Sequence, residues 1–270
     1  MSQSALTTDD LVAGWRRVGV EEGMDMIVHS SLSSLGPVDG GAATVVNSLL
    51  RAVGATGTVV VPTFTPNVAD RDPEHVGVPD EGVRERRDAV PTFHCTMPSS
   101  MGAVAEALRS LPGTVRSSHP QASVAAIGAR AGQIVAGQPL GFALGRDSPL
   151  ERLYDLRGAI LLIGVGHNRN SFLHHAEALT PRPRLTLRRF PMITHRQRIW
   201  CETVDVADDK DTYFPLVGRD FERRFGIREA IVGRAGCRLF HARPFVDFAV
   251  QRLSEFLVPE REFEPDRENG

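Results

Sequence analysis

Two short apolar runs, separated by a polar loop and an amphipathic segment, limit the folds open to this chain. The runs are Met26–His29 and Thr58–Pro62, the second rich in β-branched valines. Between them lie the polar loop Ser30–Gly36 and a helical pattern that begins at Asp39 and is closed by Gly54. Short apolar runs of this kind are typical of strands buried on both faces. Strand, loop, helix and strand in this order form a βαβ unit and predict an α/β fold.

The alternation of strand and helix signals continues along the chain. The strongest strand signal is Ala159–Gly166, and a helical segment, Phe172–Leu179, follows it. Residues 66–100 break the pattern with a polar segment interrupted by Pro and Gly, and a loop of this length is usually functional or disordered. We predict one domain over residues 1–258 and a charged, loose tail over 259–270. The other predicted elements are an opening helix that carries Leu11 to Val18, helices at Met101–Leu111, Phe221–Ile227 and Val246–Leu257, and strands at Ser123–Gly128 and Ile199–Val206.

Composition and charge narrow the class of protein. The 270 residues are 41% hydrophobic with a formal net charge of −2, and a chain of this length buries about three quarters of its unfolded surface without disulfides or a metal. A near-neutral charge argues against a non-specific nucleic-acid binder. The cysteines Cys95, Cys201 and Cys237 form no CxxC pair, and no run approaches 18 apolar residues. We expect a soluble cytoplasmic protein with no nucleic-acid or membrane partner.

Common cofactor and nucleotide motifs are missing from the sequence. Gly164-Val165-Gly166 follows a strand, but the dinucleotide fingerprint needs a third glycine where Arg169 stands, so close packing at a strand end is the better interpretation. No P-loop, nucleophile elbow or HExxH motif is present. The signature of the common acetyltransferase superfold is approached only at residues 51–56, where its last position is wrong.

His174 and Glu177 follow the strongest predicted strand at a spacing that places them on one helix face. A metal could bind there if His167 or Asp208 were recruited by folding. A histidine at the carboxyl end of a central strand could instead serve as a general base oriented by a carboxylate. It could also be a buried structural histidine. The residues alone leave these three interpretations open.

Two acid-rich stretches and two hydroxyl-rich segments suggest ligand charges. Residues 70–81 and 202–211 would create local negative fields that attract a polycationic ligand, unless they are simply solvated loops. The Ser30–Gly36 loop precedes a helix start, where hydroxyl and free backbone N–H groups bind phosphate. Residues 116–120 offer a second place to hold an anion, and neither segment is specific alone because serine-rich loops are common.

Five stretches combine these features in one ordered pattern: VHSSLSSLGPVDGG at 28–41, GTVVVPTFT at 57–65, VRSSHPQASVAAIG at 115–128, LGRDSPLERLYDL at 144–156 and LLIGVGHNRNSFLHHAE at 161–177. Over about residues 8–257 the chain resembles the aminoglycoside 3-N-acetyltransferase family, and the combination of SxHPxxSxxxxG with LLxGxGHxxNxxLHxAE is specific. The resemblance implies a central mixed β-sheet flanked by helices, the antibiotic N-acetyltransferase fold, which is unrelated to the common acetyltransferase superfold.

The resemblance also implies an activity. Acetyl-CoA would donate its acetyl group to the 3-amino group of the deoxystreptamine ring of an aminoglycoside, by direct attack and without a metal, and so confer antibiotic resistance. The histidine of the LHxAE motif, His174, would be the general base, with Asp208 or its neighbour Asp209 as the carboxylate partner. The residues implied for CoA are Ser31, Ser33, Ser34, Arg116, Ser117 and Ser123, and those implied for the antibiotic are Asp70, Asp72, Glu177 and Asp209.

A base of near-neutral pKa would suit this reaction, because the attacking amine must lose a proton. One stretch departs from the family pattern: Phe93-His94-Cys95 stands where relatives tend to have Phe-Asp-Pro, so the antibiotic range could differ. Three alternatives stay open, namely acetylation of another small amine such as a phosphonate precursor, a metal-dependent hydrolase using His167, His174 and Glu177, and a non-enzymatic acyl-CoA sensor. The oligomeric state is expected to be a monomer or a homodimer.

Overall fold

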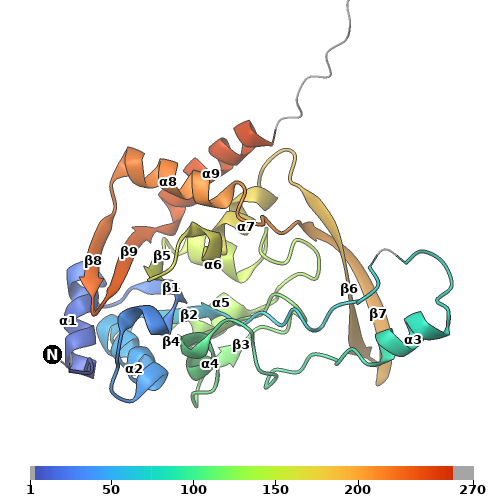
Figure 1. The fold of residues 1–270 in the computed structure, drawn as a ribbon, viewed down its shortest axis with the longest axis horizontal. Coiled ribbons are helices and arrows are strands. Elements are labelled where there is room, and N and C mark those ends of the chain that lie inside the picture. Colours follow the sequence, from blue (N-terminus) through green and yellow to red (C-terminus); the bar gives the residue numbers. More distant parts are fainter. Residues whose placement is uncertain (1–3, 74, 258–270) are drawn as a thin grey trace, which may run out of the picture.

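A mixed β-sheet forms the centre of the protein. The structure, a computed structural model, describes residues 4–73 and 75–257 (Figure 1). Within these residues seven strands pair in the order β3-β4-β2-β1-β5-β9-β8. The central strand β1 is parallel to β2 and β5, and the remaining pairs are antiparallel. The strands are β1 (Asp25–Ser30), β2 (Thr58–Pro62), β3 (Val115–Arg116), β4 (Val124–Gly128), β5 (Ala159–Ile163), β8 (Arg228–Val232) and β9 (Ala235–His241).

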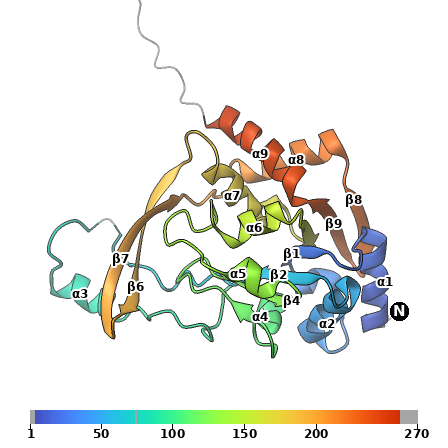
Figure 2. The ribbon, with the colours of Figure 1, turned by 180° about the vertical axis from the view of Figure 1, so that it is seen from behind.

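Helices cover both faces of this sheet because its central strands are apolar on both sides. Successive residues of β1 alternate between two apolar clusters: Met26 and Val28 pack with one layer of helices, and Ile27 packs with the other. The first layer holds α1 (Thr8–Val18), α2 (Gly41–Val53) and α4 (Ala103–Arg109). The second layer, which can be followed in Figure 2, holds α5 (Ala131–Val135), α6 (Pro149–Asp155), α7 (Phe172–Ala178), α8 (Phe214–Phe225) and α9 (Ala242–Phe256). The predicted α/β fold with a central mixed sheet flanked by helices is confirmed.

A two-stranded arm extends from this body. The strands β6 (Leu185–Thr194) and β7 (Gln197–Val206) form an antiparallel hairpin, and α3 (Glu81–Asp88) lies against its far end (Figure 1). The predicted strand at Ile199–Val206 is therefore β7 without its first two residues. Segment 66–100, predicted as a loop, contains a helix, α3, whose first turn is capped by Asp80. Charged residues dominate α3, so its sequence carries almost no apolar periodicity.

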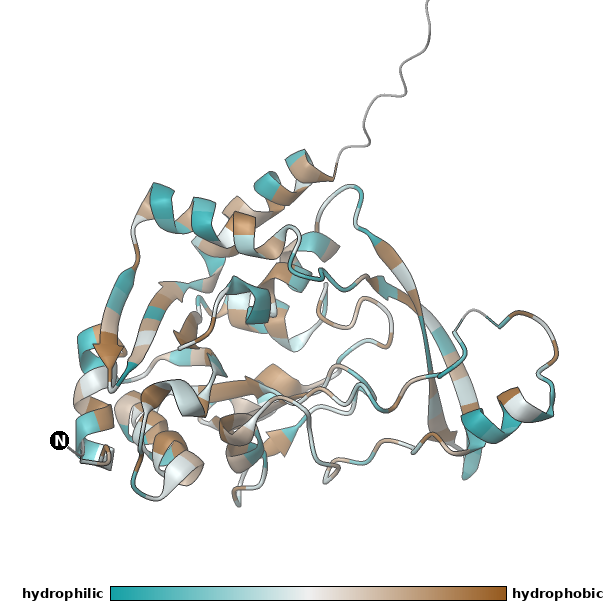
Figure 3. Cartoon of the chain, viewed as in Figure 1, coloured by the Kyte–Doolittle hydropathy of each residue, from teal (hydrophilic) through white to brown (hydrophobic). Residues whose placement is uncertain are grey.

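Several elements differ from their predicted bounds. The helix predicted at Phe221–Ile227 begins at Phe214, and the one predicted at Val246–Leu257 begins at Ala242. Some elements were not predicted, because each is short or mixes apolar with charged residues, as Figure 3 shows for β6 and β8. These elements include the strands β6, β8 and β9 and the helices α5 and α6. The predicted tail, 259–270, lies outside the described residues. Among the described helices, none is long and apolar enough to cross a membrane.

Candidate active site

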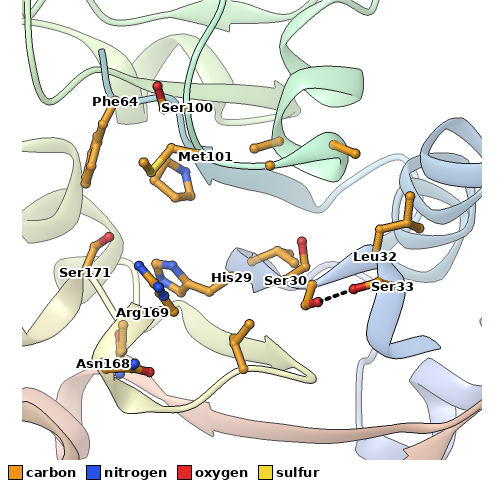
Figure 4. Close-up of a pocket in the computed structure, with 18 of the residues that line it drawn as sticks. His29, Ser30, Leu32, Ser33, Phe64, Ser100, Met101, Asn168, Arg169 and Ser171 are labelled. Atoms are coloured by element: carbon orange, nitrogen blue, oxygen red, sulfur yellow. Dashed lines mark hydrogen bonds between the residues drawn. The ribbon is translucent and has the colours of Figure 1, made fainter. Parts of the chain in front are cut away.

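A large cleft opens at the carboxyl ends of the three parallel strands β1, β2 and β5. Its volume is about 970 Å³. Ligands of α/β folds bind at this edge of a sheet, outside the carboxyl ends of the strands. The segments that line the cleft are the end of β1 with the serine-rich turn after it, the start of α2, residues 62–64 at the end of β2, residues 100–105, residues 165–174 and Phe214 (Figure 4).

A second, smaller cavity of about 230 Å³ adjoins the first. Phe64, Met101 and His174 line both cavities, so the two spaces meet at these three side chains. The smaller cavity is bounded on its other side by β6, β7 and the loop after β7, which contribute one guanidinium and two carboxylates: Arg188, Asp205 and Asp208. One space is therefore rich in hydroxyl groups and the other in carboxylates.

His174 lies at the junction of the two cavities, on the first turn of α7. Its ring meets the ring of Phe214 edge to face, with centroids 4.8 Å apart. Burial lowers the pKa of His174 to about 4, although the nearby Asp208 carboxylate acts in the opposite direction. The expectation of a near-neutral pKa therefore does not hold for this imidazole. It is uncharged at neutral pH and ready to accept a proton.

Asp208 lines the smaller cavity together with His174. Its side chain is 70% exposed, and its Oδ1 accepts a hydrogen bond of 2.9 Å from Arg188 Nη2. Partial burial raises the pKa of Asp208, but the bond and charge of Arg188 outweigh this and lower it overall. Asp208 is therefore an ionised carboxylate at neutral pH, and its charge favours the protonated form of His174.

Asp209 and Glu177, both expected to contact substrate, lie in the protein interior instead. The Glu177 side chain is 0% exposed, and its two oxygens accept hydrogen bonds from Arg184. Asp209 also binds Arg184 and accepts hydrogen bonds from the backbone N–H groups of Tyr213 and Phe214. Neither residue lines the two cavities, so of the two adjacent aspartates it is Asp208 that faces His174.

The serine-rich turn after β1 places two of its three predicted hydroxyl groups in the large cleft. Ser31 and Ser33 line the cleft, and their hydroxyl oxygens are 3.1 Å apart (Figure 4). Ser34, in contrast, donates a hydrogen bond to the Ser31 carbonyl and packs on Gly164. A Cβ at Gly164 would overlap the Ser34 side chain, and its φ of +60° also favours glycine. Close packing thus explains this glycine, as the sequence predicts.

Arg116, Ser117 and Ser123, expected to bind CoA, are bound within the protein. The Arg116 guanidinium donates hydrogen bonds to the Thr63 carbonyl and to Ser123 Oγ, and burial lowers the pKa of Arg116 to about 10. Ser117 Oγ donates to the side chain of Gln138. None of the three predicted residues lines either cavity. Their hydrogen bonds instead connect the end of β2 with the start of β4.

Asp70 and Asp72, expected to hold the antibiotic, join the arm to α3. The Asp70 side chain is 1% exposed and pairs with both Arg87 and Arg189. Asp72 pairs with Arg86. Neither aspartate lines the two cavities. Nearby arginines thus neutralise much of the charge that the first acid-rich stretch suggests, and the carboxylates at the smaller cavity come from the second stretch.

Several polar residues at the cavities were not among the predicted site residues, and four of them bear on the proposed chemistry. His29 and Ser171 line the large cleft, and Arg188 and Asp205 line the small one. Three of them had a sequence signal: His29 ends a predicted strand, Ser171 lies in the family motif at 161–177, and Asp205 belongs to the second acid-rich stretch. Burial raises the pKa of Asp205, whose carboxylate accepts hydrogen bonds from the backbone.

The three residues of the alternative metal site do not converge. His167 Nε2 is 2.9 Å from Glu222 Oε1, and its ring stacks on Phe245. Glu177 is engaged by Arg184. Over residues 4–73 and 75–257, no group of three or more His, Cys, Asp or Glu side chains has the proximity that a metal ion needs.

Comparison with known proteins finds relatives that match nearly the whole chain. The family model for aminoglycoside 3-N-acetyltransferase matches residues 27–254. The YokD protein of Bacillus subtilis strain 168, a prophage-derived aminoglycoside N(3')-acetyltransferase-like protein, is 35% identical over 90% of this chain and 89% of its own. Aminoglycoside N(3)-acetyltransferase VII of Streptomyces paromomycinus is 34% identical over 96% of each chain.

Solved structures agree in fold. The crystal structure of the aminoglycoside acetyltransferase AAC(3)-Xa superposes with a TM-score of 0.87, at 31% identity and 95% coverage of both chains. The structure of AAC-IIIb in binary complex with CoASH superposes with a TM-score of 0.84, at 27% identity over 95% of this chain and 99% of that one. With its matching sequence motifs, its mixed sheet and its cleft at the strand ends, the chain belongs to the aminoglycoside 3-N-acetyltransferase family of acyltransferases.

Proposed function

We propose that this protein transfers the acetyl group of acetyl-CoA to the 3-amino group of the deoxystreptamine ring of an aminoglycoside. The observation that carries this proposal is the position of His174, at the junction of a hydroxyl-lined cavity and a carboxylate-lined cavity. A donor in the first and an amine in the second would meet at this imidazole. The names of the relatives, several of them aminoglycoside N(3)-acetyltransferases, support the choice of acceptor.

The large cleft suits the donor. Ser31 and Ser33 supply hydroxyl groups, and the helix α2 begins at the rim with Gly40 as its N-cap and no side-chain cap. Backbone N–H groups at such a helix start bind phosphate oxygens, which CoA carries. Acetyl-CoA would supply an acyl group already activated as a thioester. The CoASH complex of AAC-IIIb supports the same class of donor.

The small cavity suits a cationic acceptor. Asp205 and Asp208 present carboxylates to it, and an aminoglycoside carries several ammonium groups. A bound ammonium group would stabilise the charged form of Asp205, whose pKa is raised by burial. The ammonium group would also compete with Arg188 for Asp208.

His174 would act as the general base. It is neutral at neutral pH, so its imidazole can take the proton that the attacking amine loses. The Asp208 carboxylate would then stabilise the imidazolium that forms, because its charge already raises the pKa of His174. A carboxylate that bonded to the ring during the reaction would also orient it, as the partner of a catalytic base commonly does.

Release of free CoA thiol from acetyl-CoA tests the proposal directly. The purified protein is incubated with acetyl-CoA alone and with gentamicin, tobramycin or apramycin. We expect release that depends on the antibiotic, and mass spectrometry should place the acetyl group on the 3-amino nitrogen. No release with any of the three antibiotics, from protein that binds CoA, would contradict the aminoglycoside acceptor and favour another small amine.

A further inference from the structure

His29 is a second imidazole in the large cleft, and the reaction proposed above does not use it. It lies near the carboxyl end of β1 and lines the cleft together with His174. Figure 4 shows its ring reaching into the space below Met101 and beside Ser171. His29 thus lies where the hydroxyl-lined cavity approaches the junction of the two cavities.

One ring nitrogen of His29 is buried without a hydrogen-bond partner in the described part of the chain. The residue is 4% exposed, and its Nε2 has no hydrogen-bond partner among the described residues. Buried polar groups in proteins are nearly always bonded, and an exception needs an explanation such as a ligand. Two other buried histidines are bonded at Nε2, His119 to the Leu140 carbonyl and His167 to Glu222. Of the unbonded buried side-chain atoms in the described chain, that of His29 alone belongs to a residue lining the large cleft.

The surroundings of His29 keep it uncharged. Burial, together with the neighbouring His167, lowers the pKa of His29 to about 3. A neutral imidazole keeps one ring N–H and can donate it, as in other enzymes where a neutral histidine polarises a carbonyl group. His29 also lines only the large cleft, whereas His174 lines both cavities. Both histidines are therefore neutral at neutral pH, and their positions in the two cavities distinguish them.

We propose that His29 donates a hydrogen bond from Nε2–H to the carbonyl oxygen of the donor thioester. This inference rests on the proposed acetyl transfer. As the amine nitrogen forms its bond to the carbonyl carbon, the π pair of the C=O bond moves to oxygen, and the His29 N–H stabilises that negative charge. The pair then returns, the C–S bond breaks with its electrons on sulfur, His174 takes the amine proton and passes it to the thiolate, and His29 keeps its own proton throughout.

Substitution of His29 separates this role from a structural one. His29→Leu removes the N–H, and we expect kcat to fall by about 10²- to 10³-fold, as on loss of one oxyanion donor, with little change in KM for either substrate. His29→Gln carries an amide N–H near the position of Nε2, and should recover much of the loss because glutamine amides also serve as oxyanion donors. A folded His29→Leu protein with near-normal kcat, or a Gln variant no better than Leu, would overturn the proposal.

Infrared spectroscopy tests the same hydrogen bond in the unaltered protein. Acetyl-CoA carrying ¹³C at the thioester carbonyl is bound without an aminoglycoside, so that no transfer occurs. We expect the carbonyl stretch to move to lower wavenumber on binding to the wild-type protein, and this shift to be lost in His29→Leu. Bound acetyl-CoA with an unshifted carbonyl stretch would refute the role of His29, whereas failure of acetyl-CoA to bind would refute the proposed function itself. The wild-type measurement decides between these outcomes even if the Leu variant does not fold.

Discussion

Two adjacent aspartates near the site have opposite surroundings. Asp208 is mostly exposed, faces the small cavity and pairs with Arg188 at the surface. Asp209 is buried, pairs with Arg184 and holds the first backbone N–H groups of α8. The side chains have the same chemistry, so their different neighbours separate a candidate catalytic role from a structural one.

Alanine at each of these two positions should therefore have different effects. Asp208→Ala should lower kcat by about 10- to 100-fold, a part of the 10²- to 10⁴-fold that a general base contributes, and leave stability within about 1 kcal/mol. Asp209→Ala should lower the free energy of unfolding by about 1–3 kcal/mol with a much smaller effect on kcat, because it leaves buried donors unpaired. Urea unfolding and steady-state kinetics on both variants check this. The reverse pattern would exchange the roles of the two aspartates.

His174 is the residue on which the proposed chemistry depends most. We expect His174→Ala to lower kcat by about 10²- to 10⁴-fold while CoA binding persists, because the ring accepts a proton but is not needed to hold the donor. Kinetics and calorimetric titration with CoA measure the two effects. His195→Ala, in the exposed turn of the β6–β7 arm, is the matched control and should keep full activity. Near-normal turnover in His174→Ala would exclude it as the base.

At the scale of elements, α8 connects the fold to the site. Its N-terminal end is held by Asp209, and its inner face packs on His167 at Gly218. A Cβ at Gly218 would overlap the His167 ring, which is itself bonded to Glu222. Glycine at this position therefore allows the helix to approach the loop that follows β5, and that loop carries the residues lining the large cleft.

Gly218→Ala tests this close approach. Alanine normally favours a helix over glycine, but here it should lower the free energy of unfolding by about 1–3 kcal/mol, because either α8 or the His167 ring must move. Gly132→Ala in α5 is the matched control, since the space around that glycine is open. The control should gain up to about 1 kcal/mol in thermal or urea unfolding. Equal gains in both variants would contradict the close contact between α8 and His167.

At the scale of the whole molecule, three histidines with lowered pKa values link stability to pH. The pKa values of His29, His119 and His174 are lowered from 6.5 to about 3, 4 and 4, with burial as the first cause in each. The unfolded chain therefore binds more protons than the folded one below about pH 6.5. The stability that the three neutral histidines contribute is therefore fully present above pH 6.5 and is lost as the pH falls toward 4.

Urea unfolding at pH 7, 6 and 5 measures this loss. We expect the free energy of unfolding to fall steadily below pH 6.5, by up to about 1.4 kcal/mol per pH unit for each of the three histidines. Lowered carboxyl pKa values, such as that of Asp70, contribute only below about pH 4 and so do not mask the effect. His195→Ala should leave the slope unchanged because that residue is exposed. A flat profile between pH 7 and 5 would contradict the lowered histidine pKa values.

Much of the central fold follows from local sequence pattern. Strands β1, β2 and β5 are short apolar runs, and α2 and α7 follow their loops with helical spacing, so the α/β arrangement around them was predictable from local pattern, whereas the mixed sheet was implied by the family resemblance. The β6–β7 arm and the edge strands of the sheet could not be predicted in this way. In β8 only Val232 is fully buried, and in α3 only Val83, so neither element has the periodic apolar face on which such predictions depend.

The sequence by itself determined the sheet centre, the family motifs and the placement of His174 after the strongest strand, because short-range patterns and spacing encode these features. Only the tertiary structure decided which polar residues face the cavities. Asp70 meets Arg189, and Arg116 meets Thr63, across segments far apart in the chain. A charged side chain is available to a ligand only where folding leaves it facing a cavity, as it does for Asp205 and Asp208. That depends on long-range contacts, which local composition does not reveal.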